Sequence, residues 1–223
     1  MLSLIFKKVL PTDKQLMEQV FRLRYQVYTQ ESNFLNPDNY PDGLERDELD
    51  DQSVHFAAIT EEGDVIGCVR MILPQPHKLP IHQFCKNLKL SEDLAPENRC
   101  AEISRLIISR EWLRPKASLL KDFRPAVRRL IYQNSFRVDS ITFRLSEELC
   151  RECKHRGVTH VFALMEKSLS GLVKKYGFDF KRIGNRVDFL GSVYPHLAST
   201  EQIDKAIMDY RFAYTKFVFK SSN

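Results

Sequence analysis

The sequence has no apolar run that approaches the ~18–20 residues needed to cross a bilayer, so no membrane-spanning helix is expected. The apolar start of the chain is interrupted at once by Lys7 and Lys8, which makes it too short and wrongly flanked for a signal peptide. Internal repeats and low-complexity tracts are also missing. The lack of a membrane span and of a signal peptide favours a cytoplasmic protein.

Cysteine is scarce and odd in number, with five residues in the chain, so a disulfide framework is not expected. Cys150-Arg-Glu-Cys153, with His155 nearby, has the spacing of half a zinc site, but a second ligand pair is missing. We therefore predict reduced cysteines on a helix and no metal site.

The chain has 223 residues and a mass of 26.1 kDa, with 43% hydrophobic and 28% charged residues. This balance is that of a folded globular protein and excludes whole-chain disorder and fibrous repeats. The length fits one large domain, or one domain with an appendage.

The net charge of +5 is distributed unevenly. Residues 36–51 contain seven acids and one base, whereas residues 105–129 contain eight bases and two acids. The acidic segment could attract a cation such as an amine, and the basic segment a phosphate or an acidic protein. The alternative for each single charge is a solvated surface.

Hydrophobic periodicity predicts a mixed α/β protein. A capping box at Thr12 and Gln15 should begin a helix over 13–30, whose buried stripe contains Leu16, Val20, Leu23 and Val27. The unit over 101–165 should form one parallel strand pair, in a sheet that is antiparallel early and parallel late. We expect strands at 2–10, 54–60, 65–73, 100–109, 158–165, 178–183, 186–191 and 214–219, and further helices at 122–155, 169–175 and 200–210.

Several charges fall in segments that should be buried. Arg70 lies in an apolar strand and needs an acidic partner or a cleft, because an unpaired buried charge is costly. In a regular strand Glu102 and Arg105 would take opposite faces, so a β-bulge is needed if both are to face one cleft. Arg24 sits at the edge of the buried face of the first helix, beside Tyr28. Asp47 and Asp50 form an acid pair in the loop over 33–52.

These residues resemble the set shared by acyl-homoserine lactone synthases, which is Arg-x3-Phe-x5-Trp, Asp-x-Tyr-Asp, Arg, Phe and Glu-x2-Arg. The charged positions match, whereas the aromatic positions differ: Tyr28 stands for Phe, Phe34 for Trp and Leu49 for Tyr. The matching residues are Arg24, Asp47, Asp50, Arg70, Phe84, Glu102 and Arg105.

A closer resemblance is to the bacterial PEP-CTERM/exosortase-associated acyltransferases and the N-acyl amino acid synthases. It rests on ordered words over residues 5–195, among them Leu23-Arg-Tyr-Gln-Val-Tyr28, Gly67-Cys-Val-Arg70, Glu102-Ile-Ser-Arg-Leu106 and Gly191-Ser-Val-Tyr-Pro195. In the family the last word often reads Gly-x-Arg-x-Pro, and Val193 replaces that arginine. The resemblance implies a GNAT-like fold, α/β (α+β), with a twisted mixed sheet splayed in the middle and flanked by helices.

The same resemblance implies a GNAT-like N-acyltransferase domain over 1–195, with a helical insertion at about 115–140, and a C-terminal appendage over 196–223 that packs on the same domain. It also implies an enzyme that moves a medium- or long-chain acyl group from a carrier thioester to the amine of an amino acid or related small amine. No permanently bound cofactor is expected, and acyl-phosphopantetheine is the co-substrate.

The donor is expected to be acyl carrier protein. Acetyl-CoA-using GNAT enzymes hold the diphosphate on a glycine-rich turn after the corresponding strand. Residues 109–119 contain no glycine and begin the basic segment, which suits an acidic carrier protein. Docking is assigned to Arg110, Arg114, Lys116, Arg124, Arg128 and Arg129. For residues 115–140, peripheral contact with a membrane surface is the open alternative to docking of the carrier.

The roles that we predict follow this chemistry. Glu102 is the general base, with Arg105 and Ser104 as further catalytic residues. Asp47 and Asp50 should hold the arginines Arg24, Arg70 and Arg105, which orient the acceptor carboxylate. The predicted substrate-binding residues are Arg24, Tyr28, Phe34, Asp47, Asp50, Arg70 and Phe84.

Three alternatives stay open. The first is an acyl-homoserine lactone synthase that uses S-adenosylmethionine as acceptor. The second is a CoA-dependent GNAT acetyltransferase. The third is a non-catalytic binding protein that uses its basic face, although no nucleic-acid-binding motif is present and no nucleic acid partner is expected.

Overall fold

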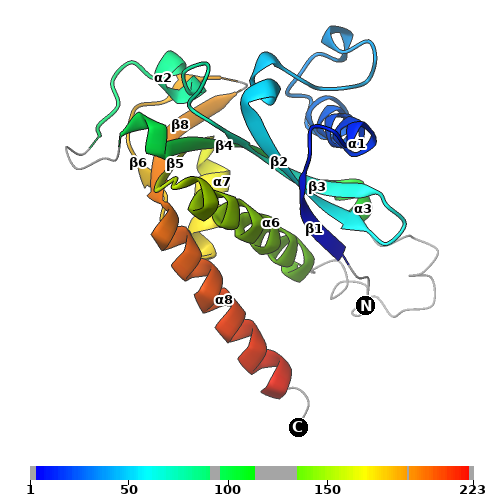
Figure 1. Ribbon diagram of the computed structural model, residues 1–223, viewed down its shortest axis with the longest axis vertical. Helices are drawn as coiled ribbons and strands as arrows, with labels where there is room; N and C mark the ends of the chain where they lie inside the picture. The colour runs from blue at the N-terminus through cyan, green and yellow to red at the C-terminus, as the bar shows by residue number, and fades with distance from the viewer. Residues whose placement is uncertain (1–3, 91–95, 114–134, 190, 221–223) are drawn as a thin grey trace. The chain divides into compact units, whose positions relative to one another are not determined.

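A computed structural model describes residues 4–90, 96–113, 135–189 and 191–220 (Figure 1). The strands follow the order β1-β2-β3-β4-β5-β8-β6, and β7 pairs with β8 outside this path. The strands are β1 Leu4–Val9, β2 Ser53–Thr60, β3 Val65–Ile72, β4 Cys100–Ile108, β5 His160–Met165, β6 Lys181–Arg182, β7 Val187–Asp188 and β8 Ser192–Ser199. The helices are α1 Lys14–Tyr25, α2 Pro80–Phe84, α3 Arg110–Leu113, α6 Ser135–Arg156, α7 Lys167–Lys175 and α8 Thr200–Lys220.

The chain divides into two compact units. The first draws on the described residues within Met1–Arg46, His55–Val69 and Arg105–Leu145, and the second on those within Asp47–Val54, Arg70–Ser104 and Ser146–Asn223. The strands β2, β3 and β4 therefore contribute residues to both units. None of the helices in the described ranges is long and apolar enough to span a bilayer.

The core of the first unit forms where α1 packs on strands. The predicted stripe of Leu16, Val20, Leu23 and Val27 is buried against residues of β1, β2, β3 and β4. Burial of side chains of this size contributes about 1.5–3 kcal/mol each. The helical prediction for 13–30 is confirmed, with α1 continuing into a π-helical turn over Gln26–Glu31. The N-cap, however, is Asp13 rather than Thr12, since Asp13 accepts a hydrogen bond from the amide of Leu16 at 3.1 Å.

The second unit is built on β5. It pairs in parallel with β4, as predicted for the segment 101–165, with Glu102 opposite Phe162. On its other edge β5 pairs antiparallel with β8, which in turn pairs antiparallel with β6 and β7. The expected parallel arrangement late in the sheet is therefore wrong beyond β5. The core of the second unit contains Ile72, Leu79, Ile81, Cys85, Cys100, Phe162 and Ile183.

The C-terminal part of the chain differs most from the prediction. β8 was not predicted, because Pro195 lies in its middle and proline disfavours a strand assignment. The predicted strand at 214–219 is wrong, since α8 continues through these residues (Figure 1). The aromatic and β-branched residues of this segment favour a strand. The helix α8 nevertheless begins at a capping pair between Ser199 and Gln202 and continues to Lys220. The boundary expected at 195 falls within β8.

Candidate active site

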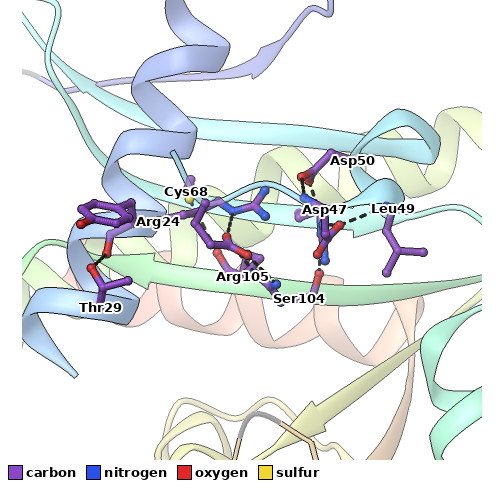
Figure 2. Close-up of polar contacts among 11 residues, drawn as sticks. Arg24, Thr29, Asp47, Leu49, Asp50, Cys68, Ser104 and Arg105 are labelled. Carbon is purple, nitrogen blue, oxygen red and sulfur yellow. Dashed lines mark hydrogen bonds and ion pairs between the residues drawn. The ribbon is translucent and has the colours of Figure 1, made fainter. Parts of the chain in front are cut away.

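In the first unit, one acid binds two arginines. The carboxylate of Glu45 accepts a hydrogen bond from Nε of Arg24. It also accepts two from Arg105, from Nη2 at 2.8 Å and from Nε at 3.2 Å (Figure 2). Arg24 and Glu45 are fully buried, and the side chain of Arg105 is 9% exposed. We call Arg24, Glu45 and Arg105 the two-arginine cluster; it carries a net charge of +1.

Local structure fixes each member of this cluster. Arg24 lies in the last turn of α1. The amide of Glu45 donates to the carbonyl oxygen of Phe21, which ties the acidic loop to the same helix. Arg105 has a φ of +53°, in the left-handed region that residues other than glycine rarely adopt. The strand is therefore irregular at Arg105, near the place where a β-bulge is needed if Glu102 and Arg105 are to face one cleft. The thiol of Cys68 donates to the carbonyl oxygen of Arg105 at 3.7 Å.

The charges of the cluster shift its pKa values. Burial alone would raise the pKa of Glu45, but the hydrogen bonds and charges of Arg105 and Arg24 outweigh it and lower the pKa below its ordinary value. Burial works against the charged form of Arg105 as well, and its bonds to Glu45 raise its pKa. Glu45 and Arg105 are therefore ionised at neutral pH.

Tyr28 covers the guanidinium of Arg105. The centre of its ring lies 5.3 Å from that guanidinium carbon, a cation–π contact. Burial raises the pKa of Tyr28 to about 12, so its hydroxyl stays neutral. The structure thus brings together Arg24, Tyr28 and Arg105 as the motif suggested.

In the second unit, one arginine binds two acids. Arg70 donates from Nη1 to Asp47 at 2.5 Å and to Asp50 at 2.7 Å, and from Nε to the hydroxyl of Ser104 at 2.9 Å (Figure 2). Arg70 is buried and has two acidic partners, which confirms the prediction that a charge in this apolar strand needs an acid. We call Arg70, Asp47, Asp50 and Ser104 the two-acid cluster; its charged members sum to −1.

A capping box makes Asp47 and Asp50 available to Arg70. Asp50 accepts a hydrogen bond from the amide of Asp47 at 2.8 Å, and Asp47 accepts one from the amide of Leu49 at 3.0 Å. Both carboxylates are thereby fixed at the start of the 3₁₀ helix Glu48–Gln52, Asp47 as its N-cap and Asp50 as its third residue. The short Asp-x-x-Asp spacing in the sequence is the local cause of this geometry.

Glu102 is buried in the second unit, with 2% of its surface exposed. Its Oε2 accepts a hydrogen bond from the amide of Ile81 at 2.8 Å, at the start of α2. A buried carboxylate on a strand, bonded by a backbone amide, is a suitable proton acceptor if a substrate amine reaches it. The assignment as general base stays a prediction.

The two predicted aromatic residues are exposed. Phe34 is 46% exposed, and its amide donates to the carbonyl oxygen of Tyr28 at 2.8 Å. Phe84 is 45% exposed and stacks on Phe189, with ring centres 4.2 Å apart. Of the predicted docking residues, Arg110 is exposed on α3, and the others, Arg114, Lys116, Arg124, Arg128 and Arg129, lie outside the described residues, as does most of the expected insertion.

The cysteines and possible metal ligands add no further centre. Cys150 and Cys153 are free thiols buried on α6, as predicted, and burial raises the pKa of each to about 12. Within the described ranges, no group of three His, Cys, Asp or Glu side chains could hold a metal ion.

Sequence reasoning missed the acid that binds two of the three arginines. It assigned Arg24, Arg70 and Arg105 to Asp47 and Asp50, whereas Glu45 binds Arg24 and Arg105. Glu45 was visible only as one of seven acids in the loop. The signal that could have found it is the need of two further buried arginines for a carboxylate of their own.

Comparison with known proteins supports the fold. Residues 23–121 match the family model described as an acetyltransferase (GNAT) domain. None of the curated proteins compared with the chain matches it significantly.

Solved structures match nearly the whole chain at low identity. TofI, in a ternary complex with an inhibitor and MTA, is 17% identical with a TM-score of 0.62, covering 92% of this chain and 96% of its own. The CoA-dependent acyl-homoserine lactone synthase BjaI, with SAM and isopentyl-CoA, is 17% identical with a TM-score of 0.65, covering 92% and 88%. The AHL synthase LasI is 16% identical with a TM-score of 0.63, covering 90% and 91%.

The fold is thus GNAT-like, with a mixed sheet flanked by helices, as the resemblance implied. The chain carries an acyltransferase domain of the GNAT type, and enzymes are among the solved structures that share its fold.

Proposed function

We propose that the protein is an N-acyltransferase that moves a fatty acyl group from an acyl carrier protein thioester to the amine of an amino acid or related small amine. The observation that carries this proposal is Glu102, a buried carboxylate on β4 in a chain with a GNAT domain. The proposal also includes that the protein is one of the exosortase-associated acyltransferases, and this part rests on the short sequence motifs quoted above.

The chemistry needs a proton acceptor and no nucleophilic side chain. The neutral amine attacks the thioester carbonyl, a C–N bond forms, and Glu102 accepts the proton that the nitrogen loses. The C–S bond then breaks, and the thiolate of the phosphopantetheine arm leaves and takes up that proton. The products are an amide and a free thiol.

The acceptor class is proposed from Arg105, whose side chain is 9% exposed in the first unit. A guanidinium binds a carboxylate through paired N–H donors, so Arg105 supports an acceptor that carries a carboxylate beside its amine. An amino acid is such an acceptor.

A second candidate is an acyl-homoserine lactone synthase with S-adenosylmethionine as acceptor. It is supported by the fold shared with BjaI and LasI. Against it stand Phe34 and Leu49, which occupy the positions where the lactone synthases have Trp and Tyr. S-adenosylmethionine also contains an amino acid moiety, so Arg105 would serve both candidates in the same way.

A product screen separates these candidates. The purified protein is incubated with acyl carrier proteins loaded with C8 to C18 chains or the matching acyl-CoAs, together with pooled amino acids and S-adenosylmethionine. Mass spectrometry of the products should show an N-acyl amino acid. A homoserine lactone would replace the proposal with the second candidate, and no product from any donor and acceptor would contradict both.

The role of Glu102 is tested with Glu102→Gln. We expect a loss of about 10²–10⁴ in kcat, because the variant cannot accept the proton, with an unchanged fold. The matched control is Glu97→Gln, which alters an exposed acid in the turn before β4. Wild-type turnover in Glu102→Gln would contradict the assignment.

A further inference from the structure

At the end of β4 in the first unit, backbone amides are hydrogen-bonded to groups of the protein itself. Where α3 begins, the amide of Arg110 donates to Oε2 of Glu31 at 3.2 Å. The amide of Trp112 donates to the hydroxyl of Ser109 at 3.2 Å, and the amide of Ser109 donates to the carbonyl oxygen of Ile66 at 2.9 Å. The backbone donors at Ser109, Arg110 and Trp112 therefore already have acceptors, one of them a carboxylate.

One glutamine holds two carboxylates at this point. Nε2 of Gln26 lies 3.0 Å from Oε1 of Glu31, 3.2 Å from Oε2 of Glu111 and 3.4 Å from Oγ of Ser109. No lysine or arginine in the described ranges forms an ion pair with Glu31 or Glu111. The group, which we call the Glu31 latch (Gln26, Glu31, Ser109 and Glu111), thus has a net charge of −2 and a neutral donor between the acids.

Backbone amides at a turn after a strand are a common binding place for phosphate, because their N–H groups and the local dipole favour negative charge. In this chain a carboxylate already takes that place. A diphosphate at the end of β4 would have to displace Glu31 from the amide of Arg110 and would lie beside two negative charges. Repulsion between the phosphates and these two carboxylates disfavours binding of the diphosphate.

We propose that the Glu31 latch determines donor specificity by excluding the diphosphate of CoA from the end of β4. This inference rests on the proposed function, with the thioester placed beside Arg105, in the part of β4 that belongs to the first unit. Five residues of fully extended chain span about 17 Å at most, so the distance from Arg105 to Arg110 lies within the reach of an extended pantetheine arm. A carrier-bound arm has a single phosphodiester there, whereas CoA has a diphosphate and a further phosphate on its ribose.

The first test measures binding of CoA alone by calorimetry, so it needs neither acyl transfer nor a known acceptor. Glu31→Gln keeps an acceptor for the amide of Arg110 and removes the charge. We expect CoA to bind about fivefold more tightly to this variant, the upper range for one exposed charge pair, and more tightly still to the double variant E31Q/E111Q. Saturable binding that appears only in the variants supports the proposal equally.

Glu18→Gln is the matched control, since it removes an exposed acid from α1 that pairs with Arg22. Equal affinity for CoA in wild type, E31Q and E31Q/E111Q, or an equal gain in E18Q, would overturn the proposal. Thermal unfolding confirms that each variant is folded.

The second test compares acyl-pantetheine, acyl-phosphopantetheine and acyl-CoA as donors. The ratio of kcat/KM for acyl-CoA to that for acyl-pantetheine should rise about fivefold in E31Q, while the ratio for acyl-phosphopantetheine changes less. An unchanged acyl-CoA ratio would overturn the role of Glu31. If wild type transfers no acyl group at all, the proposed function fails, whereas the CoA-binding comparison still decides the role of the latch.

Discussion

The two charged clusters have inverse compositions. In the first unit a single acid, Glu45, holds two buried arginines, and in the second a single arginine, Arg70, holds two acids and a serine. Glu45 is shared by the two arginines of the first cluster, whereas Arg70 in the second cluster has two acids and a serine as partners. The difference predicts that the same kind of substitution has very different effects in the two units.

The largest effect is expected for Glu45→Gln. The substitution leaves two buried guanidinium groups without their shared counter-charge, and breaking a buried ion pair by removing one partner costs about 3–5 kcal/mol. Urea unfolding at pH 7 measures the loss. Glu48→Gln, an exposed acid three residues on in the same loop, should change the free energy of unfolding little. Equal losses of unfolding free energy in both variants would contradict the account of Glu45 as the counter-charge of two buried arginines.

A pH series sharpens the same comparison. The pKa of Glu45 is lower in the folded protein than its ordinary value of 4.5, so the folded state resists protonation more than the unfolded chain does. Its stabilising contribution is complete above that ordinary value and is lost as pH falls through the lower, folded-state pKa. The difference in unfolding free energy between wild type and Glu45→Gln should therefore narrow below about pH 4.5. A difference that stays constant from pH 7 to pH 3 would contradict this account.

A smaller effect is expected for Asp50→Asn in the two-acid cluster. Arg70 keeps Asp47 and Ser104, and the asparagine oxygen can still accept the amide of Asp47, so the loss should be about 1–2 kcal/mol. Urea unfolding of Asp50→Asn and of Glu45→Gln under the same conditions compares the two losses in the free energy of unfolding. A loss as large as that of Glu45→Gln would show that the second cluster has no spare partner.

The smallest effect is expected for Tyr28→Phe. The ring that covers Arg105 remains and only the neutral hydroxyl is removed, so the free energy of unfolding should change by less than about 1 kcal/mol. Tyr28→Ala, which removes the ring, is the comparison and should cost more. If both variants lose the same amount, the contact between ring and guanidinium does not stabilise the cluster.

The amino-acid pattern predicted most elements that have a strong local period. The stripe of α1, the strands β2 and β3, and the parallel pair of β4 and β5 all have the expected type and place. Arg70 was also predicted correctly to need an acid, because a charge inside an apolar strand is a local anomaly with a known energetic cost. Local propensity gave the wrong secondary structure where it was weak or mixed, at Pro195 in β8 and in the second half of α8.

The sequence by itself determined the types of most elements, the residues of the first core and the need of its buried arginines for acids. The tertiary structure alone decided which acid each arginine binds. Glu45 lies 21 residues from Arg24 and 60 from Arg105, in a loop without periodicity, so nothing in its sequence neighbourhood distinguishes it from the acids around it. Only the fold of the acidic loop onto α1 buries this one carboxylate, and burial is what makes its charge decisive.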